Sequence, residues 1–188
     1  MWSRHYNKVA NKQMAMHLNT TYKYLTVIAL GFLVFMLDYL ELANPLVNEI
    51  LLLLVCVGKS AYFIWFALFY IRETANREFY FHDLVPFVGL TVLLIILSFG
   101  LDYYCLYQIN PGAFTGDLEL DNLLAAGLTF LYFSVTTFTT AGLGDIIPHA
   151  LSARLFVMME LFIAFFFTIL VIANIGQIRE SFAQKAKK

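Results

Sequence analysis

The chain has 188 residues, of which 61% are hydrophobic and 13% are charged. A soluble globular domain is about 45–50% apolar and about 25% charged, and a chain of this length cannot bury so large an apolar excess in one core. These values, with a mean hydropathy of +0.73, exclude a soluble enzyme and a disordered tail. The net charge of -1 offers no basic surface, so no nucleic acid partner is expected. The sequence is that of an integral membrane protein, whose first partner is the lipid bilayer.

Four apolar runs are long enough to cross the hydrocarbon as helices, which takes about 20 residues. They extend over Tyr24–Leu42, Ile50–Ile71, Leu84–Tyr107 and Leu155–Ile178. Their length and lack of alternation predict helices rather than barrel strands. A fifth apolar stretch, Leu123–Phe138, is shorter and favours a re-entrant half-helix over a crossing. The predicted fold is an all-α integral membrane protein with four transmembrane helices and one re-entrant helix.

Basic residues are concentrated at the two ends of the chain. Residues 1–23 contain Lys and Arg but no acid, and no Lys or Arg occurs between Glu78 and Arg154. Cytoplasmic flanks collect Lys and Arg, so both termini are expected in the cytoplasm, with loop 43–49 and region 108–153 outside. The segment 1–23 is either an interfacial helix on the inner leaflet or a loose basic tail.

The most informative stretch is Tyr132–Pro148, with the sequence YFSVTTFTTAGLGDIIP. Gly142 and Gly144 are spaced by one residue and permit backbone angles that side chains forbid. Such a loop can turn successive carbonyls the same way. At membrane depth, irregular backbone is tolerated only in protein or along a water-filled path, where a row of carbonyls can bind an alkali cation.

These residues carry a family resemblance. Thr140–Asp145 resembles the TVGYGD selectivity filter of the potassium-channel family, and Tyr132–Val135 is similar to the Trp-Trp-Ser-Val sequence of the family's pore helix. The paired Thr139 and Thr140 match the threonines at the end of that helix. The acid Glu160 lies where many small bacterial members have one. The likeness covers about residues 84–178, roughly half of the chain, and resembles a small bacterial-type ion channel.

The resemblance implies a homotetramer in which each chain gives one filter strand. The hydroxyl of Thr140 and the carbonyls of Thr140, Ala141, Gly142 and Leu143 would bind dehydrated K+, and no other cofactor is implied. Gly144 would permit the outer turn of the filter. The residues expected to support the filter are Asp145, Thr136, Tyr132 and Glu160.

The chain then divides into four parts. These are the basic segment 1–23, two transmembrane helices within 24–83, a pore module over 84–178 and a short cytoplasmic tail at 179–188. The pore module comprises an outer helix, a pore helix over 123–139, the filter over 140–145 and an inner helix over 153–178. Helical spacing on the inner helix predicts a stripe that lines the cavity and inner gate, unless part of it packs on neighbouring helices. The stripe consists of Phe165, Thr168, Ile172 and either Ile175 or Gly176.

Two residues depart from the family pattern. Ala141 replaces Val, a mild change because the backbone provides the ligand. Leu143 replaces a Tyr that often hydrogen-bonds to the pore helix, and Leu has no donor. Potassium selectivity depends on cavity geometry and the field of the carbonyls, so a slacker filter would admit more sodium.

Charged residues outside the filter are open to two interpretations. Lys59 is the only cation inside the second span, so a voltage sensor is not indicated, and an ion pair with Asp38 is the predicted arrangement. Asp117, Glu119 and Asp121 either raise the cation concentration at the outer mouth or form a solvated loop.

The sequence thus predicts a potassium-selective channel in the plasma membrane that performs no covalent chemistry. The alternatives are a weakly selective sodium and potassium channel and a non-conducting accessory subunit. A membrane enzyme would need converging catalytic or metal-binding groups at depth, and the spans contain no His pair with metal-ligand spacing.

Overall fold

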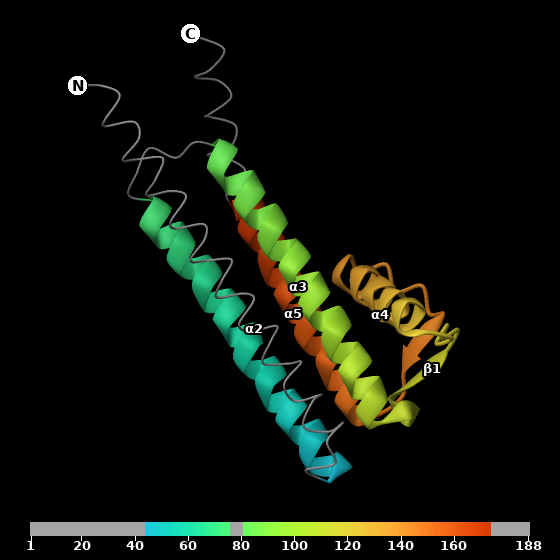
Figure 1. Cartoon of the computed structure of the whole chain (residues 1–188). Coiled ribbons are helices and arrows are strands. Elements are labelled where there is room, and N and C mark those ends of the chain that lie inside the picture. Colours follow the sequence, from blue (N-terminus) through green and yellow to red (C-terminus); the bar gives the residue numbers. More distant parts are fainter. Residues whose placement is uncertain (1–43, 76–80, 174–188) are drawn as a thin grey trace, which may run out of the picture.

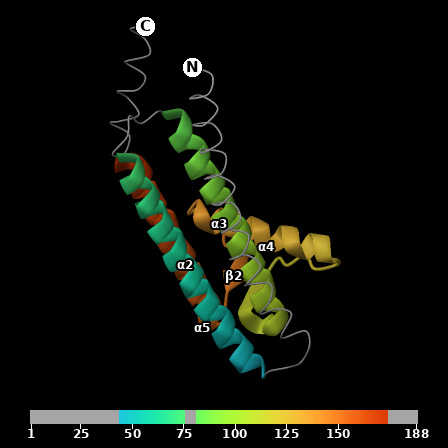
Figure 2. The same cartoon turned by 60° about the vertical axis from the view of Figure 1, so that its left-hand side comes forward.

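The structure is a computed structural model that describes residues 44–75 and 81–173. Three long helices, α2 (Pro45–Ala75), α3 (Phe81–Ile109) and α5 (Leu151–Ala173), lie side by side, with α3 antiparallel to the other two (Figure 1). The shorter helix α4 (Leu123–Phe138) projects sideways from α3, on the side away from α2 (Figure 2). Helix α2 packs on both α3 and α5, whereas α4 packs mainly on α3.

Within the described residues, three helices are long and apolar enough to cross a membrane. These segments are Leu46–Phe69, Val88–Ile109 and Leu151–Ala173. They correspond to the second, third and fourth spans that the sequence predicts. The predicted first span, Tyr24–Leu42, lies outside the described residues, as does the basic segment before it.

Two predicted boundaries are wrong. Residues 45–49 were expected in an outer loop, but they form the first turn of α2. The carbonyl of Asn44 accepts hydrogen bonds from Val47 N at 2.8 Å and Asn48 N at 3.1 Å. Pro45 suits the first helical position because its ring fixes φ there and its missing N–H would have no partner. Helix α5 begins at Leu151 rather than at 153, and its predicted end at 178 lies outside the described residues.

The core lies where α2, α3 and α5 meet and continues between α3 and α4. Helix α2 contributes one buried face, and an aromatic cluster joins α3 to α4. In that cluster the ring centroids of Tyr103 and Phe133 are 4.9 Å apart. Gly100 allows the two helices to approach, because a Cβ there would lie 3.1 Å from the Cα of Leu131. Both cysteines, Cys56 and Cys105, are buried and unpaired.

A small antiparallel sheet joins the segment before α4 to the segment after it. Strand β1 (Phe114–Gly116) follows the 3-10 helix η1 (Pro111–Ala113), and strand β2 (Ile146–Pro148) follows the predicted filter. Gly116 is paired with Ile146 in the register of this sheet. The segments before and after α4 are therefore fastened to each other at the same end of the molecule as the start of α5.

Candidate functional site: the loop after helix α4

Helix α4 has a defined start and is too short to span a bilayer. The side chain of Asn122 caps its first turn by accepting a hydrogen bond from Ala125 N at 2.8 Å. Its 16 residues give a length of about 24 Å, less than the roughly 30 Å of a hydrocarbon core. The helix ends at Phe138, one residue before the predicted end, with Thr139 as its C-cap.

The end of α4 also shapes the loop that follows. Thr140 N donates to Thr137 O at 2.9 Å, and Ala141 N donates to Thr136 O at 2.8 Å. These two bonds form a Schellman motif, in which the residue after the cap adopts a left-handed conformation and is usually glycine. Here that residue is Thr140, with φ 57. A left-handed β-branched residue costs about 1–2 kcal/mol, a strain that is typical of functional sites.

Left-handed residues alternate along the loop. Positive φ angles occur at Thr140 (57), Gly142 (51) and Gly144 (80), and neither Ala141 nor Leu143 has one. The N–H groups of Thr140 and Ala141 both point back to carbonyls of α4, and a run of N–H groups on one side of a chain leaves the carbonyls able to face the other side. Gly142 N also points toward Thr136 O, at 3.3 Å. Residues 140–144 are all exposed in the single chain.

The outer end of the loop is held at Asp145. The hydroxyl of Tyr132, on α4, donates to its carboxylate at 2.5 Å, and Ile146 N donates to the other carboxylate oxygen at 3.0 Å. The hydrogen bond from Tyr132 is the main reason that the pKa of Asp145 lies below its ordinary value. The backbone carbonyl of Asp145 accepts from Asp117 N at 3.0 Å. The loop is thus tied both to α4 and to the segment that follows β1.

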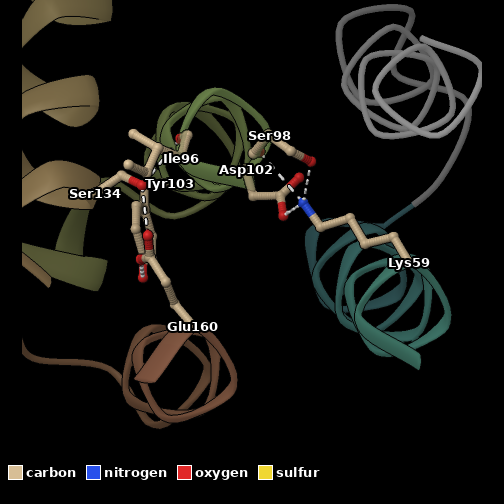
Figure 3. A network of polar contacts seen from close by, with 7 residues as sticks. All are labelled: Lys59, Ile96, Ser98, Asp102, Tyr103, Ser134 and Glu160. Atoms are coloured by element: carbon tan, nitrogen blue, oxygen red, sulfur yellow. Dashed lines mark hydrogen bonds and ion pairs between the residues drawn. The ribbon is translucent and has the colours of Figure 1, made fainter. Parts of the chain in front are cut away.

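Glu160 lies on α5 and reaches the back of α4 (Figure 3). It is fully buried, and its two carboxyl oxygens lie 2.6 Å from Ser134 Oγ and 2.5 Å from Tyr103 Oη. Ser134 Oγ is also 2.9 Å from the carbonyl of Ile96, and one hydroxyl hydrogen cannot serve both acceptors. All the contacts are satisfied when the carboxyl of Glu160 carries a proton and donates to Ser134. A neutral carboxyl also avoids an unpaired charge at membrane depth.

Thr136 contacts the loop through its backbone rather than its side chain. Its hydroxyl donates to Phe133 O at 3.0 Å, within the same helix. Its carbonyl is the group that receives the N–H groups of Ala141 and Gly142. A substitution of the Thr136 side chain therefore leaves the contact with the loop in place.

The predicted cavity stripe is exposed on α5. Phe165, Thr168 and Ile172 all face away from the other described residues, with 65% of Phe165 and 60% of Ile172 accessible. The hydroxyl of Thr168 donates to Ala164 O at 2.9 Å, as a helical threonine often does. Ile175 lies outside the described residues. Exposed apolar side chains on one face of a helix are open to water, lipid or another subunit.

Comparison with known proteins identifies the family of this loop and its flanking helices. A family model described as an ion channel matches residues 91–180. The chain is 32% identical over 66 residues to the potassium channel protein kcv of Paramecium bursaria Chlorella virus 1, a match that covers 34% of this chain and 70% of the viral protein. The chain belongs to the potassium-channel family with a single pore loop. No solved structure matches it.

In this channel, Lys59 is held by a partner that the sequence analysis did not choose. Its ammonium forms an ion pair with Asp102 on α3 and a hydrogen bond of 2.8 Å with Ser98 Oγ (Figure 3). Asp38, the predicted partner, lies outside the described residues. Ser98 and Asp102 are four residues apart, so both lie on the face of α3 that meets α2. The four-residue spacing of Ser98 and Asp102 was a signal in the sequence that could have identified them as the partners of Lys59.

The acidic residues predicted at the outer mouth lie beside the loop. Asp117 and Glu119 line a groove of about 510 Å³ that also reaches Tyr132 and Asp145. Asp121 is exposed and is not part of the groove lining. Two of the three predicted acids therefore lie near the end of the predicted filter.

Two supporting residues of the channel were not predicted. Tyr103 was passed over because it reads as one more aromatic residue at the end of a span. Gly116 was missed because strands of three residues carry too little pattern to be recognised. Its role follows from geometry, since a Cβ on Gly116 would lie 1.9 Å from the carbonyl oxygen of Asp145.

Proposed function

We propose that this protein conducts potassium selectively through the loop 140–145. The ligands would be the hydroxyl of Thr140 and the backbone carbonyls from Thr140 to Leu143. The observation that carries the proposal is the alternation of left-handed residues directly after α4, a helix too short to cross a bilayer. This alternation allows the carbonyls to face one side of the loop, and such a group can replace the hydration shell of an alkali cation.

We propose that four copies of the chain surround one axis, the number that the family resemblance implies, because one pore loop per chain can close a path only by cyclic symmetry. The exposed residues 140–144 and the exposed stripe of Phe165, Thr168 and Ile172 support this assembly, since both would then line the central path. Each subunit would have four transmembrane helices, the first over 24–42. Both termini would lie in the cytoplasm, in a plasma membrane.

Selectivity depends on how the loop is held at position 143, where Leu143 replaces a hydrogen-bonding Tyr. The side chain of Leu143 is 66% exposed, whereas the hydroxyl of Tyr132 is used by Asp145. The loop is therefore held at Asp145 and Thr136 without a hydrogen bond from position 143. This arrangement supports a rigid, selective loop. A weakly selective cation channel is the second candidate, favoured by the absence of a donor on Leu143.

The test is flux of K+ and Na+ into liposomes that contain the purified protein. Gly142→Ala is the decisive variant, because a Cβ there meets no atom within 4 Å and acts only through φ +51. Gly127→Ala is its matched control, since that position on α4 is equally open and has no positive φ. We expect potassium flux far above sodium flux, abolished by Gly142→Ala and retained by Gly127→Ala.

Other results discriminate among the alternatives. Equal fluxes of both ions, lost in Gly142→Ala, would replace the selective channel with a weakly selective one. If neither ion crosses with the unmodified protein, the result points to a closed gate that needs an activator or to an accessory subunit. Flux that survives Gly142→Ala would place the path outside the loop.

A further inference from the structure

Two buried polar clusters meet on consecutive residues of α3. Asp102 and Tyr103 are neighbours in the chain and point about 100° apart around the helix. Asp102 faces α2 and pairs with Lys59, while Tyr103 faces α5 and donates to Glu160 (Figure 3). Glu160 in turn contacts Ser134 on α4 at 2.6 Å. A continuous series of contacts thus runs from α2 to the helix that carries the loop.

An aromatic route runs beside the polar one. The ammonium of Lys59 lies 4.5 Å from the centroid of the Phe99 ring, a cation–π distance. The Phe99 and Tyr103 rings are 6.2 Å apart, and the Tyr103 and Phe133 rings are 4.9 Å apart with edges meeting faces. Phe133 is on α4. Both routes therefore start at Lys59, pass through Tyr103 and end on α4.

The members of the polar route are shielded from solvent to an unusual degree. The side chains of Lys59 and Asp102 are 1% and 3% accessible, and Tyr103, Ser134 and Glu160 are fully buried. A charged residue at membrane depth is expensive, and it is usually retained for a function. A purely apolar contact would pack α2 against α3 equally well, so the ion pair indicates a need to fix the rotation of α3 about its own axis. That rotation sets where Tyr103 points.

We propose that Lys59 is a positioning residue for the filter: through Asp102 and Tyr103 it holds α4 and the loop 140–145 in place. The role as a filter rests on the proposed function, whereas the mechanical link rests on the contacts alone. Helix α2 is then a support for the pore helix rather than a sensor. When Lys59 is lost, α3 is free to turn, Tyr103 withdraws from Glu160, and α4 loosens.

The experiment compares Lys59→Met with Ser60→Ala, a matched control on the neighbouring buried residue of α2, which lies outside both routes. Hydrogen–deuterium exchange is followed by mass spectrometry for peptides that cover 132–145, in the full-length protein. The amides of residues 139–142 are the reporters because each donates to a carbonyl of α4. We expect Lys59→Met to raise their exchange about 2- to 30-fold, the range of coupling through packed networks, and Ser60→Ala to leave it unchanged.

A double variant separates a specific link from general loosening. In a Tyr103→Leu background both routes are already cut, because both pass through Tyr103, so Lys59→Met should add no further exchange. Effects that simply multiply would mean independent sites and would overturn the proposal. Increased exchange confined to α2 and α3 would overturn it as well.

Folding and conduction are controlled separately. If Lys59→Met does not fold, Lys59→Met with Asp102→Asn removes both charges and leaves no unpaired ion, and the same exchange increase is expected. The K+ to Na+ permeability ratio, measured in parallel, should fall for Lys59→Met and not for Ser60→Ala. If the unmodified protein does not conduct, the proposed function is not supported while the exchange data still decide the link.

Discussion

The contact between Gly116 and Asp145 gives the sharpest quantitative prediction. Gly116 has φ +118, and a Cβ built there would lie 1.9 Å from the carbonyl oxygen of Asp145. Real Cβ contacts stay beyond 3.0 Å, so Gly116→Ala forces the two backbones apart by about 1 Å. The carbonyl of Asp145 also accepts a hydrogen bond from Asp117 N, which the movement breaks.

The magnitude follows from these two effects. An L-residue held at such a φ costs about 1–3 kcal/mol, and the lost hydrogen bond costs about 1 kcal/mol. The expected destabilisation is about 3 kcal/mol. At about 3 °C per kcal/mol for a chain of this size, the Tm should fall by about 9 °C. Potassium flux should fall too, because Asp145 ends the predicted filter.

The assay is thermal unfolding of the purified protein together with liposome flux. Gly112→Ala is the matched control, since it lies in the same outer segment and its Cβ would meet only Asn110 Oδ1, at an ordinary 3.4 Å. It should change stability by about 0.5 kcal/mol or less. If Gly116→Ala behaves like Gly112→Ala in both measurements, the reasoning about β1 and Asp145 is refuted.

Three further predictions concern the support of the loop. Glu160→Gln should keep most of the stability and flux, because its amide N–H donates to Ser134 and its carbonyl accepts from Tyr103. Glu160→Leu should lower the free energy of unfolding by about 1–2 kcal/mol, because both hydrogen bonds are lost. Equal thermal melts for the two variants would contradict a hydrogen-bonded role for Glu160. The hydrogen bond from Tyr132 lowers the pKa of Asp145, so its stabilisation is present above the ordinary pKa of 3.8 and is lost as the pH falls through the lower folded value. Tyr132→Phe should therefore lower the Tm above that ordinary pKa and have little effect at lower pH, and an unchanged Tm above it would show that the bond does not form. Leu143→Tyr should leave the K+ to Na+ permeability ratio within about twofold, because the ligand is the carbonyl; a rise of tenfold or more would favour weak selectivity in the unmodified protein.

The sequence predicted the features that depend on composition over many residues. Hydropathy placed the three spans that the structure describes, since each has a long apolar run with a single charged residue. The two glycines and the family resemblance pointed to the loop 140–145. Glycine is the residue that most readily adopts a positive φ, so Gly142 and Gly144 could be recognised as turn positions from the sequence. Helix α4 was recognised because its apolar stretch is too short to cross.

Features that depend on packing between distant residues were missed or misassigned. Lys59 was paired with Asp38 because both were compared only by depth, whereas rotation around the helix places Asp102 opposite it. The start of α2 was put too late because Asn44 and Pro45 were read as loop residues rather than as a cap and a first turn. Tyr103 acquires its role only from the side chain of Glu160, 57 residues further along the chain.

The carbonyl of Thr136, which accepts from two N–H groups, affects which substitutions the loop tolerates. The N–H groups of Ala141 and Gly142 both point to its carbonyl, so backbone atoms that every residue except proline carries hold the loop in shape. The side chain at position 141 is free to drift without altering that shape, in keeping with the alanine found there. Substitutions at position 141 can therefore change the side chain while the backbone conformation is retained. Proline is the exception, because it lacks the N–H that bonds to Thr136.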